Sequence, residues 1–351
     1  MPFTVLIAGG GPAAMEAALA LHRLAGDRVA TTVLAPEAEF TYRPLSVLEP
    51  FAEGGTTTYP LARFAADAGF THVRDRLASV DTDACEVHTV TGERLPYDAL
   101  LIASGARPVV PFAGAVAFTG SLTDQERLHG IVQDIEEGYL RSLAFVVPPG
   151  ASWPLPLYEL ALMLATRAFE MGMSPELHFV TPEAKPLELF DTRVGDLLDL
   201  AGIRLHTQTA WQPGMLNVQR VVTLPVLEGP AIEGLPCDER GFLVTDPHGR
   251  VTPGVFAAGD VTNYEIKQGG LACQMADAAA EQIAADAGAP VRPQPFKPEL
   301  QGLLLTGHWA RYLRQGGGGQ TLATRGLRWP PAKIAGRELG RYLKTLEPVM
   351  Q

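Results

Sequence analysis

The stretch from residue 3 to residue 34 restricts the possible folds more than any other part of the chain. Phe3–Ala8 is an apolar run rich in β-forming residues, and three glycines follow it directly. An Ala-rich helical stretch, Pro12–Ala25, comes next, and Val29–Leu34 is a second apolar run. The order of strand, tight turn, helix and strand predicts a βαβ unit, and therefore an α/β fold with a parallel sheet.

The turn inside this unit has the composition of a pyrophosphate-binding loop. The residues expected to form it are Gly9, Gly11, Pro12, Ala13 and Ala14. Gly9 permits the tight turn, Gly11 lets backbone N–H groups approach a phosphate, and Ala14 allows close packing of helix on strand. The N-terminus of the helix favours the anion. A glycine-rich turn in an unrelated α/β protein is the alternative, and the strand that follows argues against it.

The end of the second strand departs from the usual pattern of such units. An acidic residue at this point normally binds the adenosine ribose, but the residue here is Ala35. Glu37 follows two residues later, directly after Pro36. We therefore expect Pro36 and Glu37 to lie beside the adenosine.

A second strand–helix–strand pattern lies in the middle of the chain. It consists of an apolar run at Leu143–Val147, a helical stretch at Leu155–Met171 and a second apolar run at Leu177–Val180. We interpret it as a weak internal duplication of the dinucleotide-binding unit. The chain is expected to return to the first domain around Gly229–Asp246.

The second pattern lacks the glycines of the first. Superposition aligns Gly9-x-Gly11-x-x-Ala14-x-Glu16 with Ser152-x-Pro154-x-x-Leu157-x-Glu159. Proline has no N–H to offer a phosphate oxygen, and a Cβ atom blocks the close approach of a pyrophosphate. We expect this half of the chain to keep the fold but to bind NAD(P)H weakly or not at all.

Two further motifs accompany the glycine-rich turn. The apolar run that starts at Thr252 ends in Gly259-Asp260, and Leu101–Arg107 contains a small-residue turn. The carboxylate of Asp260, at a strand end, can accept hydrogen bonds from the ribityl hydroxyls of a flavin. Gly259 leaves space for that chain. The combination in this order is specific.

On these motifs, the sequence resembles the FAD-dependent pyridine nucleotide-disulfide oxidoreductase superfamily. It is most similar to sulfide:quinone oxidoreductases and type II NADH dehydrogenases, over residues 1–112 and 230–310. The resemblance implies an α/β fold of two Rossmann-like three-layer (ββα) domains with a short C-terminal cap, and non-covalent FAD. The implied limits are 1–112 with 230–290 for a discontinuous FAD-binding domain, 113–229 for a degenerate NAD(P)H-binding-like domain, and 291–351 for the cap.

The same resemblance implies further contacts with FAD. Tyr42–Leu45 is similar to the stretch that runs beside the adenosine and the flavin, and Lys267–Gly270 opens the helix that points its amides at the flavin pyrimidine. Besides the glycine-rich turn and Gly259-Asp260, the residues expected to bind the cofactor are Pro36, Glu37, Arg43, Pro44, Leu77, Ala103, Ser104, Gly105, Gly270 and Leu271.

Two residues are candidates for catalysis. Lys267 is the charged residue nearest to the expected flavin edge. Cys273 lies about one turn into the following helix, where a helix N-terminus would lower the pKa of a thiol; the alternative is a small buried core residue. Trp153 and Tyr158 either cover a substrate pocket between the domains or pack in the interior. The histidines show no metal-ligand spacing, so no metal site is indicated.

The cysteines and the composition limit the chemistry and the partners. Cysteine is absent between residues 86 and 236 and after 273, so sulfide oxidation through a cysteine trisulfide, as in the sulfide:quinone oxidoreductases, is not expected. A net charge of −11 disfavours nucleic acid. The N-terminus does not read as a secretory signal, and no uninterrupted apolar run is long enough to span a membrane, so we expect a cytoplasmic protein.

The last 51 residues differ in charge from the rest. Residues 301–351 hold eight Lys or Arg and two Glu, a net +6, which leaves −17 for residues 1–300. After a Gly316–Gly319 linker, the basic residues recur at helical spacing on one face: Lys333, Arg337, Arg341 and Lys344. A helix over 333–346 would either lie on the inner face of a membrane or dock its apolar side on the FAD domain. A homodimer is a further possibility.

These observations predict an FAD-dependent oxidoreductase. A small molecule or a protein donates electrons to the flavin, and an acceptor, expected to be a quinone, reoxidises it. Two alternatives stay open. One is an NAD(P)H:acceptor reductase with an unorthodox nucleotide loop, and the other is a flavin-binding redox-sensing module without turnover.

Overall fold

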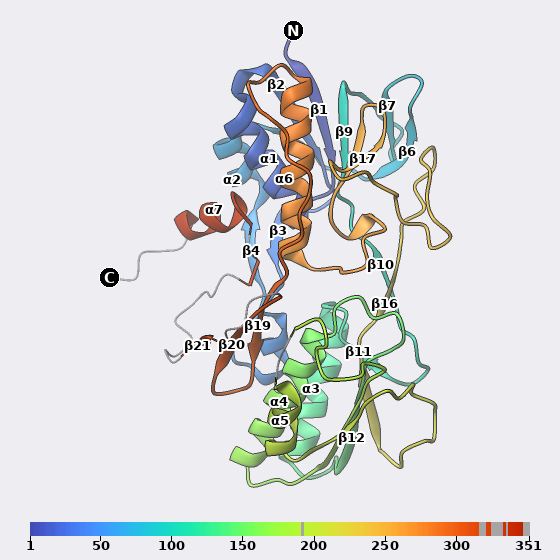
Figure 1. Ribbon diagram of the computed structural model, residues 1–351, viewed down its shortest axis with the longest axis vertical. Coiled ribbons are helices and arrows are strands. Elements are labelled where there is room, and N and C mark those ends of the chain that lie inside the picture. The colour runs from blue at the N-terminus through green and yellow to red at the C-terminus, as the bar shows by residue number, and fades with distance from the viewer. Residues whose placement is uncertain (191–192, 316–320, 324–332, 335, 347–351) are drawn as a thin grey trace.

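The computed structural model describes residues 1–190, 193–315, 321–323, 333–334 and 336–346. Two lobes, each built on a parallel sheet, are stacked along the long axis of the molecule (Figure 1). The first lobe is formed by the N-terminal part together with residues from about 230 to 290, and the second lobe by the middle of the chain. The C-terminal elements run along one side of both lobes.

The first lobe contains a six-stranded sheet in the order β17-β18-β9-β1-β2-β5. Its strands, in sheet order, are Arg250–Thr252, Val255–Ala257, Ala99–Ile102, Phe3–Ala8, Val29–Leu34 and Thr71–Val73. All neighbours pair in parallel except β17 and β18. The strands β1 and β2 have the bounds predicted from the sequence. The central strand β9 is buried along its whole length, as expected where both faces of a parallel sheet are covered.

Two helices cover one face of this sheet, and a small antiparallel sheet covers the other. The helices are α1 (Pro12–Ala25) and α6 (Gly269–Asp286), whose many buried alanines let them pack closely on each other and on the strands. The opposite layer consists of β6 (Leu77–Asp81), β7 (Glu86–Thr89) and β8 (Arg94–Pro96). This lobe therefore has the predicted three-layer order.

Short elements connect these layers. They are 3₁₀ turns at η1 (Gly26–Arg28), η2 (Ser46–Phe51) and η3 (Gly259–Val261), the hairpin of β3 (Glu39–Tyr42) and β4 (Thr57–Pro60), and the helix α2 (Leu61–Ala68). The hairpin extends from the first lobe toward the second (Figure 1).

The second lobe contains a five-stranded parallel sheet in the order β11-β15-β12-β13-β14. The strands, in that order, are Val116–Ala117, Arg220–Thr223, Ser142–Val146, Glu176–Val180 and Ile203–His206, and the helices are α3 (Leu122–Glu136), α4 (Leu155–Glu170) and α5 (Val194–Leu200). The strand–helix–strand pattern predicted here is confirmed to within one residue at each boundary. On the face away from the helices, the described residues 207–219 form an irregular segment, which packs Trp211 against the sheet in place of a strand layer.

The chain passes between the lobes through a two-stranded antiparallel ribbon of β10 (Arg107–Val109) and β16 (Val226–Glu228). Figure 1 shows this ribbon at the level where the lobes meet. The cores of the two lobes are separate clusters, one around α1 and α6 and one around α4.

The C-terminal part contacts both lobes. The hairpin of β19 (Gln301–Leu305) and β20 (Ala310–Arg314), with β21 (Thr321–Ala323), places buried leucines against α4. The helix α7 begins at Leu339, six residues later than predicted, and ends at Leu346. It buries Leu339 and Leu343 on the first lobe, and its Tyr342 ring lies 4.7 Å from that of Phe64. Docking on the FAD lobe is therefore what the structure shows; the Gly316–Gly319 linker lies outside the described residues.

Candidate functional site

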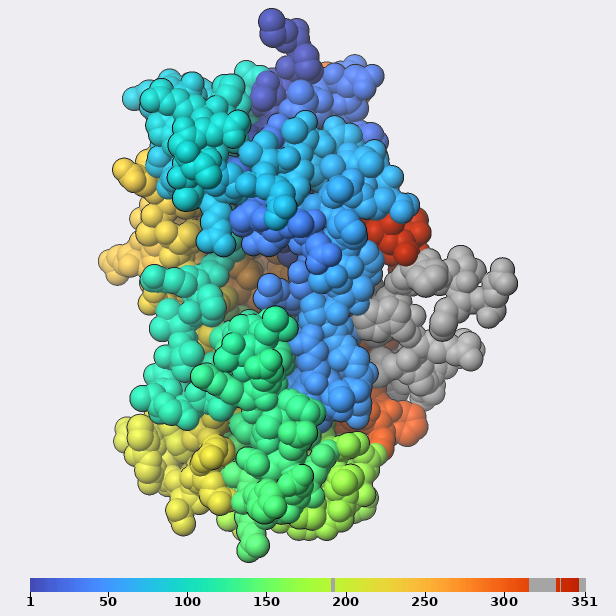
Figure 2. All heavy atoms as spheres, turned by 180° about the vertical axis from the view of Figure 1, so that it is seen from behind, coloured from blue at the N-terminus to red at the C-terminus, as the bar shows by residue number. Residues whose placement is uncertain are grey.

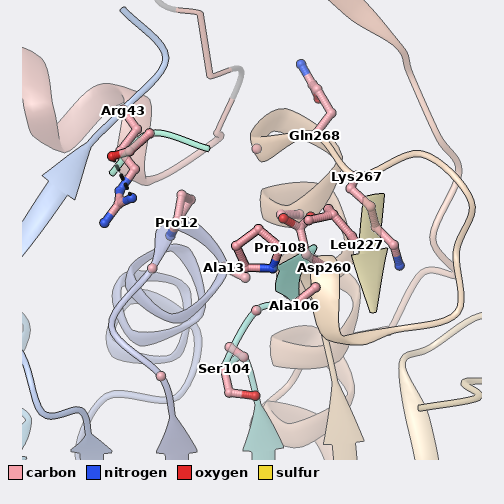
Figure 3. Close-up of a pocket in the computed structure, with 18 of the residues that line it drawn as sticks. Pro12, Ala13, Arg43, Ser104, Ala106, Pro108, Leu227, Asp260, Lys267 and Gln268 are labelled. Atoms are coloured by element: carbon pink, nitrogen blue, oxygen red, sulfur yellow. Dashed lines mark hydrogen bonds between the residues drawn. The ribbon is translucent and has the colours of Figure 1, made fainter. Parts of the chain in front are cut away.

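One cavity of about 900 Å³ lies where the two lobes meet. In the space-filling view from behind, the surface is hollowed between the lobes (Figure 2). The close-up shows Pro12 and Ala13 from α1, Ser104 from the end of β9, and Asp260 from the segment after β18, all around this space (Figure 3). Three motifs that are far apart in the sequence are thus brought together.

The glycine-rich turn has the geometry of an anion site. Gly9 has φ +138°, and a Cβ atom on it would lie only 2.2 Å from the carbonyl oxygen of Ala103, so the ends of β1 and β9 can meet only at a glycine. Gly11 has no atom within 4 Å of such a Cβ position. No side chain caps the N-terminus of α1, so its first N–H groups are free to bind an anion. The residues present fit a pyrophosphate.

The wall next to this turn carries the residues that were predicted to lie beside an adenosine. Pro36 and Glu37 line the cavity, as does Arg43, whose Nη1 atom donates to the carbonyl oxygen of Gly120 at 3.4 Å. This contact, drawn in Figure 3, joins the first lobe to a loop of the second. Glu37 thus lies in the wall beside the glycine-rich turn, and its contact with an adenosine stays a prediction.

The opposite end of the cavity is formed by the residues after β18 and by the start of α6. Asp260 is half-buried in the wall; burial raises the pKa of its carboxyl group, and the charge of Lys267 opposes this. No described residue forms a hydrogen bond with this carboxylate, which leaves it available to the hydroxyls of a ligand. The side chain of Gln268 caps α6 by accepting a hydrogen bond from the N–H of Leu271 at 2.9 Å.

Lys267 lies at this end of the cavity but has partners of its own. Its ammonium group donates to the carbonyl oxygen of Thr262 and sits 4.0 Å from the centre of the Phe242 ring. Burial lowers the pKa of Lys267 to about 8, and Asp260 opposes this shift. The structure places the residue at the predicted end of the site, and its catalytic role stays a prediction.

Four predicted residues do not line the cavity: Ala14, Gly270, Leu271 and Cys273. Ala14 and Leu271 are fully buried, and Ala14 packs between helix and sheet as expected. For Cys273 the predicted lowering of the thiol pKa is wrong. Burial raises the pKa of this thiol, and the neighbouring carboxylates of Glu16 and Asp277 raise it further, so the effect of the helix N-terminus is outweighed. Cys273 is a core residue.

Of the four basic residues predicted to share one face of the C-terminal helix, Lys333 is turned inward and lies before the helix begins. Lys333 forms a buried ion pair with Glu159 of α4, with Nζ at 2.6 and 2.9 Å from the two carboxylate oxygens. Arg337 pairs with Asp277 and Glu281 of α6. Arg337 is nevertheless exposed, as are Arg341 and Lys344 on α7.

The carboxylate of Glu159 accepts three hydrogen bonds from two donors. Besides Lys333, the backbone N–H of Leu305 donates to its carboxylate at 3.0 Å. Burial raises the pKa of Glu159, and the ammonium group of Lys333 opposes this. Both side chains line the cavity, so a strand of the cap, a helix of the second lobe and the C-terminal segment meet at its wall.

The loop before α4 is the counterpart of the glycine-rich turn. Trp153 lines the cavity, whereas Tyr158 is fully buried and donates to a carboxylate oxygen of Glu183 at 2.5 Å. The hydroxyl of Thr181 donates to the same oxygen at 2.9 Å. Glu183 follows β13 as Glu37 follows β2, so the acidic residue that would bind a second adenosine ribose is held by the chain itself.

Sequence reasoning missed several lining residues. Thr41, Ser46 and Val47 flank Arg43-Pro44, and a wider reading of that segment would have found them. Gly302, Leu303, Lys333 and Ile334 come from the C-terminal part and carry no motif. No group of three or more His, Cys, Asp or Glu that could hold a metal ion occurs among the described residues. No helix within the described ranges is long and apolar enough to cross a membrane.

Two lobes with parallel sheets, a three-layer first lobe and a shared cavity define the fold of the two-domain flavoprotein reductases. Residues 3–143 match the family model described as pyridine nucleotide-disulphide oxidoreductase. This match covers less than half of the chain and confirms the resemblance drawn from its motifs. The family implies FAD binding.

Curated relatives of the chain are oxidoreductases. The chain is 26% identical to a sulfide-quinone reductase of Aquifex aeolicus over 185 residues, which are 51% of this chain and 43% of that protein, less than half of its length. It is 27% identical over 299 residues to an NADH dehydrogenase-like protein of Mycobacterium tuberculosis, covering 73% and 72% of the two chains.

Solved structures show the same fold. The sulfide:quinone oxidoreductase from Aquifex aeolicus superimposes with a TM-score of 0.80 at 19% identity, covering 99% of this chain and 89% of that one. A ferredoxin reductase from Rhodopseudomonas palustris gives a TM-score of 0.65 at 18% identity, covering 88% and 81%.

Proposed function

We propose that this protein is an FAD-dependent oxidoreductase that passes electrons from a small-molecule or protein donor to an acceptor of the quinone class. The observation that carries the proposal is the convergence of three separate motifs on one cavity, with an anion-binding turn at one end and Asp260 at the other. Bound FAD would supply the two-electron carrier; the protein binds and orients it and sets its potential.

The residues of this chain have defined tasks in that reaction. The turn at Gly9 and Gly11, with the N-terminus of α1, holds the pyrophosphate. The carboxylate of Asp260 accepts hydrogen bonds from the ribityl hydroxyls. The N-terminus of α6, which faces the same cavity through Gly269, places the positive end of the helix dipole where the reduced flavin carries negative charge.

The second lobe supports the view that NAD(P)H is not the donor. Pro154 stands at the N-cap of α4, where a dinucleotide loop would offer N–H groups, and Glu183 is already engaged by Tyr158. Cysteine chemistry is not proposed either, because neither Cys85, Cys237 nor Cys273 lines the cavity. The quinone acceptor is supported by a relative that is named a sulfide-quinone reductase.

The test is an absorption spectrum of the purified protein followed by anaerobic titration. We expect a bound-FAD spectrum, bleaching by dithionite, no bleaching at micromolar NADH or NADPH, and reoxidation by one equivalent of a soluble quinone. An Asp260→Ala variant should retain less FAD, and Asp27→Ala, at an exposed position of the same lobe, serves as the control. Rapid bleaching by NADH would favour the NAD(P)H:acceptor reductase. A flavin that no reductant reduces would favour the redox-sensing module.

A further inference from the structure

The part of the cavity that faces the second lobe is built from the ends of parallel strands. The strands β15, β11 and β12 are neighbours in the sheet, and the loops that follow them run toward the first lobe. In α/β sheets this crevice is the usual ligand site. The wall formed by these loops, called the second-lobe wall, is represented by Phe118, Trp153, Leu155, Pro156, Leu224 and Leu227.

The second-lobe wall is apolar. Its six side chains carry no charge, and the charge of Glu159 beside them is matched by Lys333 in the buried ion pair. The loop 148–156 contains four prolines in nine residues, which removes four backbone N–H groups. Arg43 enters from the first lobe and is assigned to FAD. Among the described residues of this wall, the two phosphates of a dinucleotide would find no unpaired positive charge, and their desolvation would be costly.

The wall also presents a fixed aromatic ring. Trp153 is half-buried, and its ring contacts Phe190 edge to face, with centroids 6.0 Å apart and planes at 71°. Gly302 of β19 closes the gap behind it, since a Cβ atom there would lie 3.3 Å from Leu155 and 3.6 Å from Phe190. An aromatic side chain held on one side and facing a cavity on the other can stack on a planar ligand without losing much entropy.

We propose that the second-lobe wall binds an uncharged, planar ring compound of the quinone class, in the place where a nicotinamide dinucleotide would bind in a glycine-rich lobe. Trp153 stacks on the ring, the leucines exclude water, and the hydroxyl of Ser152 can donate to a ring carbonyl. This inference rests on the proposed function and adds the position and chemical class of one of its two substrates.

The test is calorimetric titration of the oxidised FAD-containing protein with 2-methyl-1,4-naphthoquinone and, separately, with NAD⁺. We expect the quinone to bind and NAD⁺ not to. A Trp153→Leu variant, which keeps an apolar side chain but loses the ring, should bind the quinone at least tenfold more weakly. Trp309→Leu is the matched control, because Trp309 is 57% exposed on the cap hairpin and does not line the cavity; its affinity should not change.

A second variant guards against a folding defect. Leu227 is half-buried, so Leu227→Gln should leave FAD content unchanged and still weaken quinone binding. Unchanged affinity in both wall variants would overturn the proposal, as would micromolar binding of NAD⁺ that the quinone displaces. Trp153-dependent binding without reoxidation of the reduced flavin would sink the proposed function and leave this inference standing. Quinone turnover by Trp153→Leu with an unchanged KM would support the proposed function and overturn this inference.

Discussion

Breaking the ion pair between Glu159 and Lys333 is expected to destabilise the protein strongly. The Glu159 side chain is 1% exposed and that of Lys333 is 7% exposed, so neither charge reaches much water. Lys333→Met leaves a buried carboxylate with one remaining donor, the N–H of Leu305. Loss of one member of a buried pair costs about 3–5 kcal/mol. With about 2–4 °C per kcal/mol for a domain of 150–250 residues, Tm should fall by roughly 6–20 °C.

The size of this effect should depend on pH, and the sign follows from linkage. Burial raises the pKa of Glu159 in the folded protein, and removal of Lys333 raises it further because the opposing charge is gone. A carboxyl group whose folded-state pKa is raised binds more protons in the folded state, so its contribution to stability is lost as pH rises. The deficit of Lys333→Met should therefore be largest at neutral pH and shrink as pH falls toward about 4, the unfolded value for Glu.

Urea unfolding of the FAD-containing protein, followed by circular dichroism at pH 5 and pH 7.5, measures the effect. Lys344→Met, on the exposed side of α7, is the matched control and should lie within about 0.5 kcal/mol of the parent. The double variant Glu159→Leu with Lys333→Met should recover most of the loss, because an apolar pair of similar volume carries no uncompensated charge. A single variant no less stable than the control, or a double variant worse than the single one, would refute the reasoning.

Three further predictions concern other parts of the site. Gly9→Ala places a Cβ atom 2.2 Å from a backbone oxygen and should abolish FAD binding, measured by the absorbance ratio of flavin to protein, whereas Gly130→Ala, in open space on α3, should not. Burial, more than any other cause, raises the pKa of Asp277 to about 7. The parent protein should therefore lose stability as pH rises from about 4 to 7. Asp277→Asn should make the free energy of unfolding, measured by urea titration, less dependent on pH over this range. Iodoacetamide should label the exposed Cys85 and spare Cys273, as peptide mass spectrometry would show; fast labelling of Cys273 in the folded protein would contradict its burial.

The first lobe could be predicted from the sequence because its signals are local. The apolar run Phe3–Ala8 indicates a strand, the glycines after it indicate a turn, and the Ala-rich stretch Pro12–Ala25 indicates a helix. The structure has the strand and the helix with these bounds. The cavity end at Asp260 was also predictable, since a glycine and a carboxylate at the end of an apolar strand have few other uses. In these cases the residues that specify an element lie within a few positions of it in the sequence.

The C-terminal segment was predicted less well because its contacts are long-range. The helical spacing of the basic residues predicted one helix from Lys333, yet the helix begins at Leu339. Lys333 instead forms an ion pair with Glu159, 174 positions earlier in the chain. For Cys273 the sequence left two alternatives, a thiol with a pKa lowered by the helix N-terminus and a buried core residue, and the structure shows the second. Burial between the layers raises the pKa of this thiol, and Glu16 of α1 and Asp277, one turn further along α6, raise it further. Hydrophobic and charge periodicity cannot predict contacts between residues on distant elements, such as Lys333 with Glu159 or Cys273 with Glu16.

The internal duplication places two of the residues in these long-range contacts, Glu16 and Glu159, at equivalent positions of the two lobes. Glu16 is the fifth residue of α1 and Glu159 is the fifth residue of α4, and the two are aligned in the superimposed patterns. Both are buried, and both are satisfied by the same C-terminal segment. Glu16 accepts the N–H groups of Glu338 and Leu339, each at 2.7 Å, while Glu159 accepts the ammonium group of Lys333.

The described residues 333–334 and 336–339 therefore contact corresponding positions of the two lobes. Because Lys333 and Ile334 also line the cavity, this link lies at the point where the cavity crosses from one lobe to the other. The N-terminus of α7 stabilises the buried carboxylate of Glu16, because a helix N-terminus carries partial positive charge. The ammonium group of Lys333 stabilises the buried carboxylate of Glu159 on the second lobe. The C-terminal segment thus satisfies one buried carboxylate on each lobe.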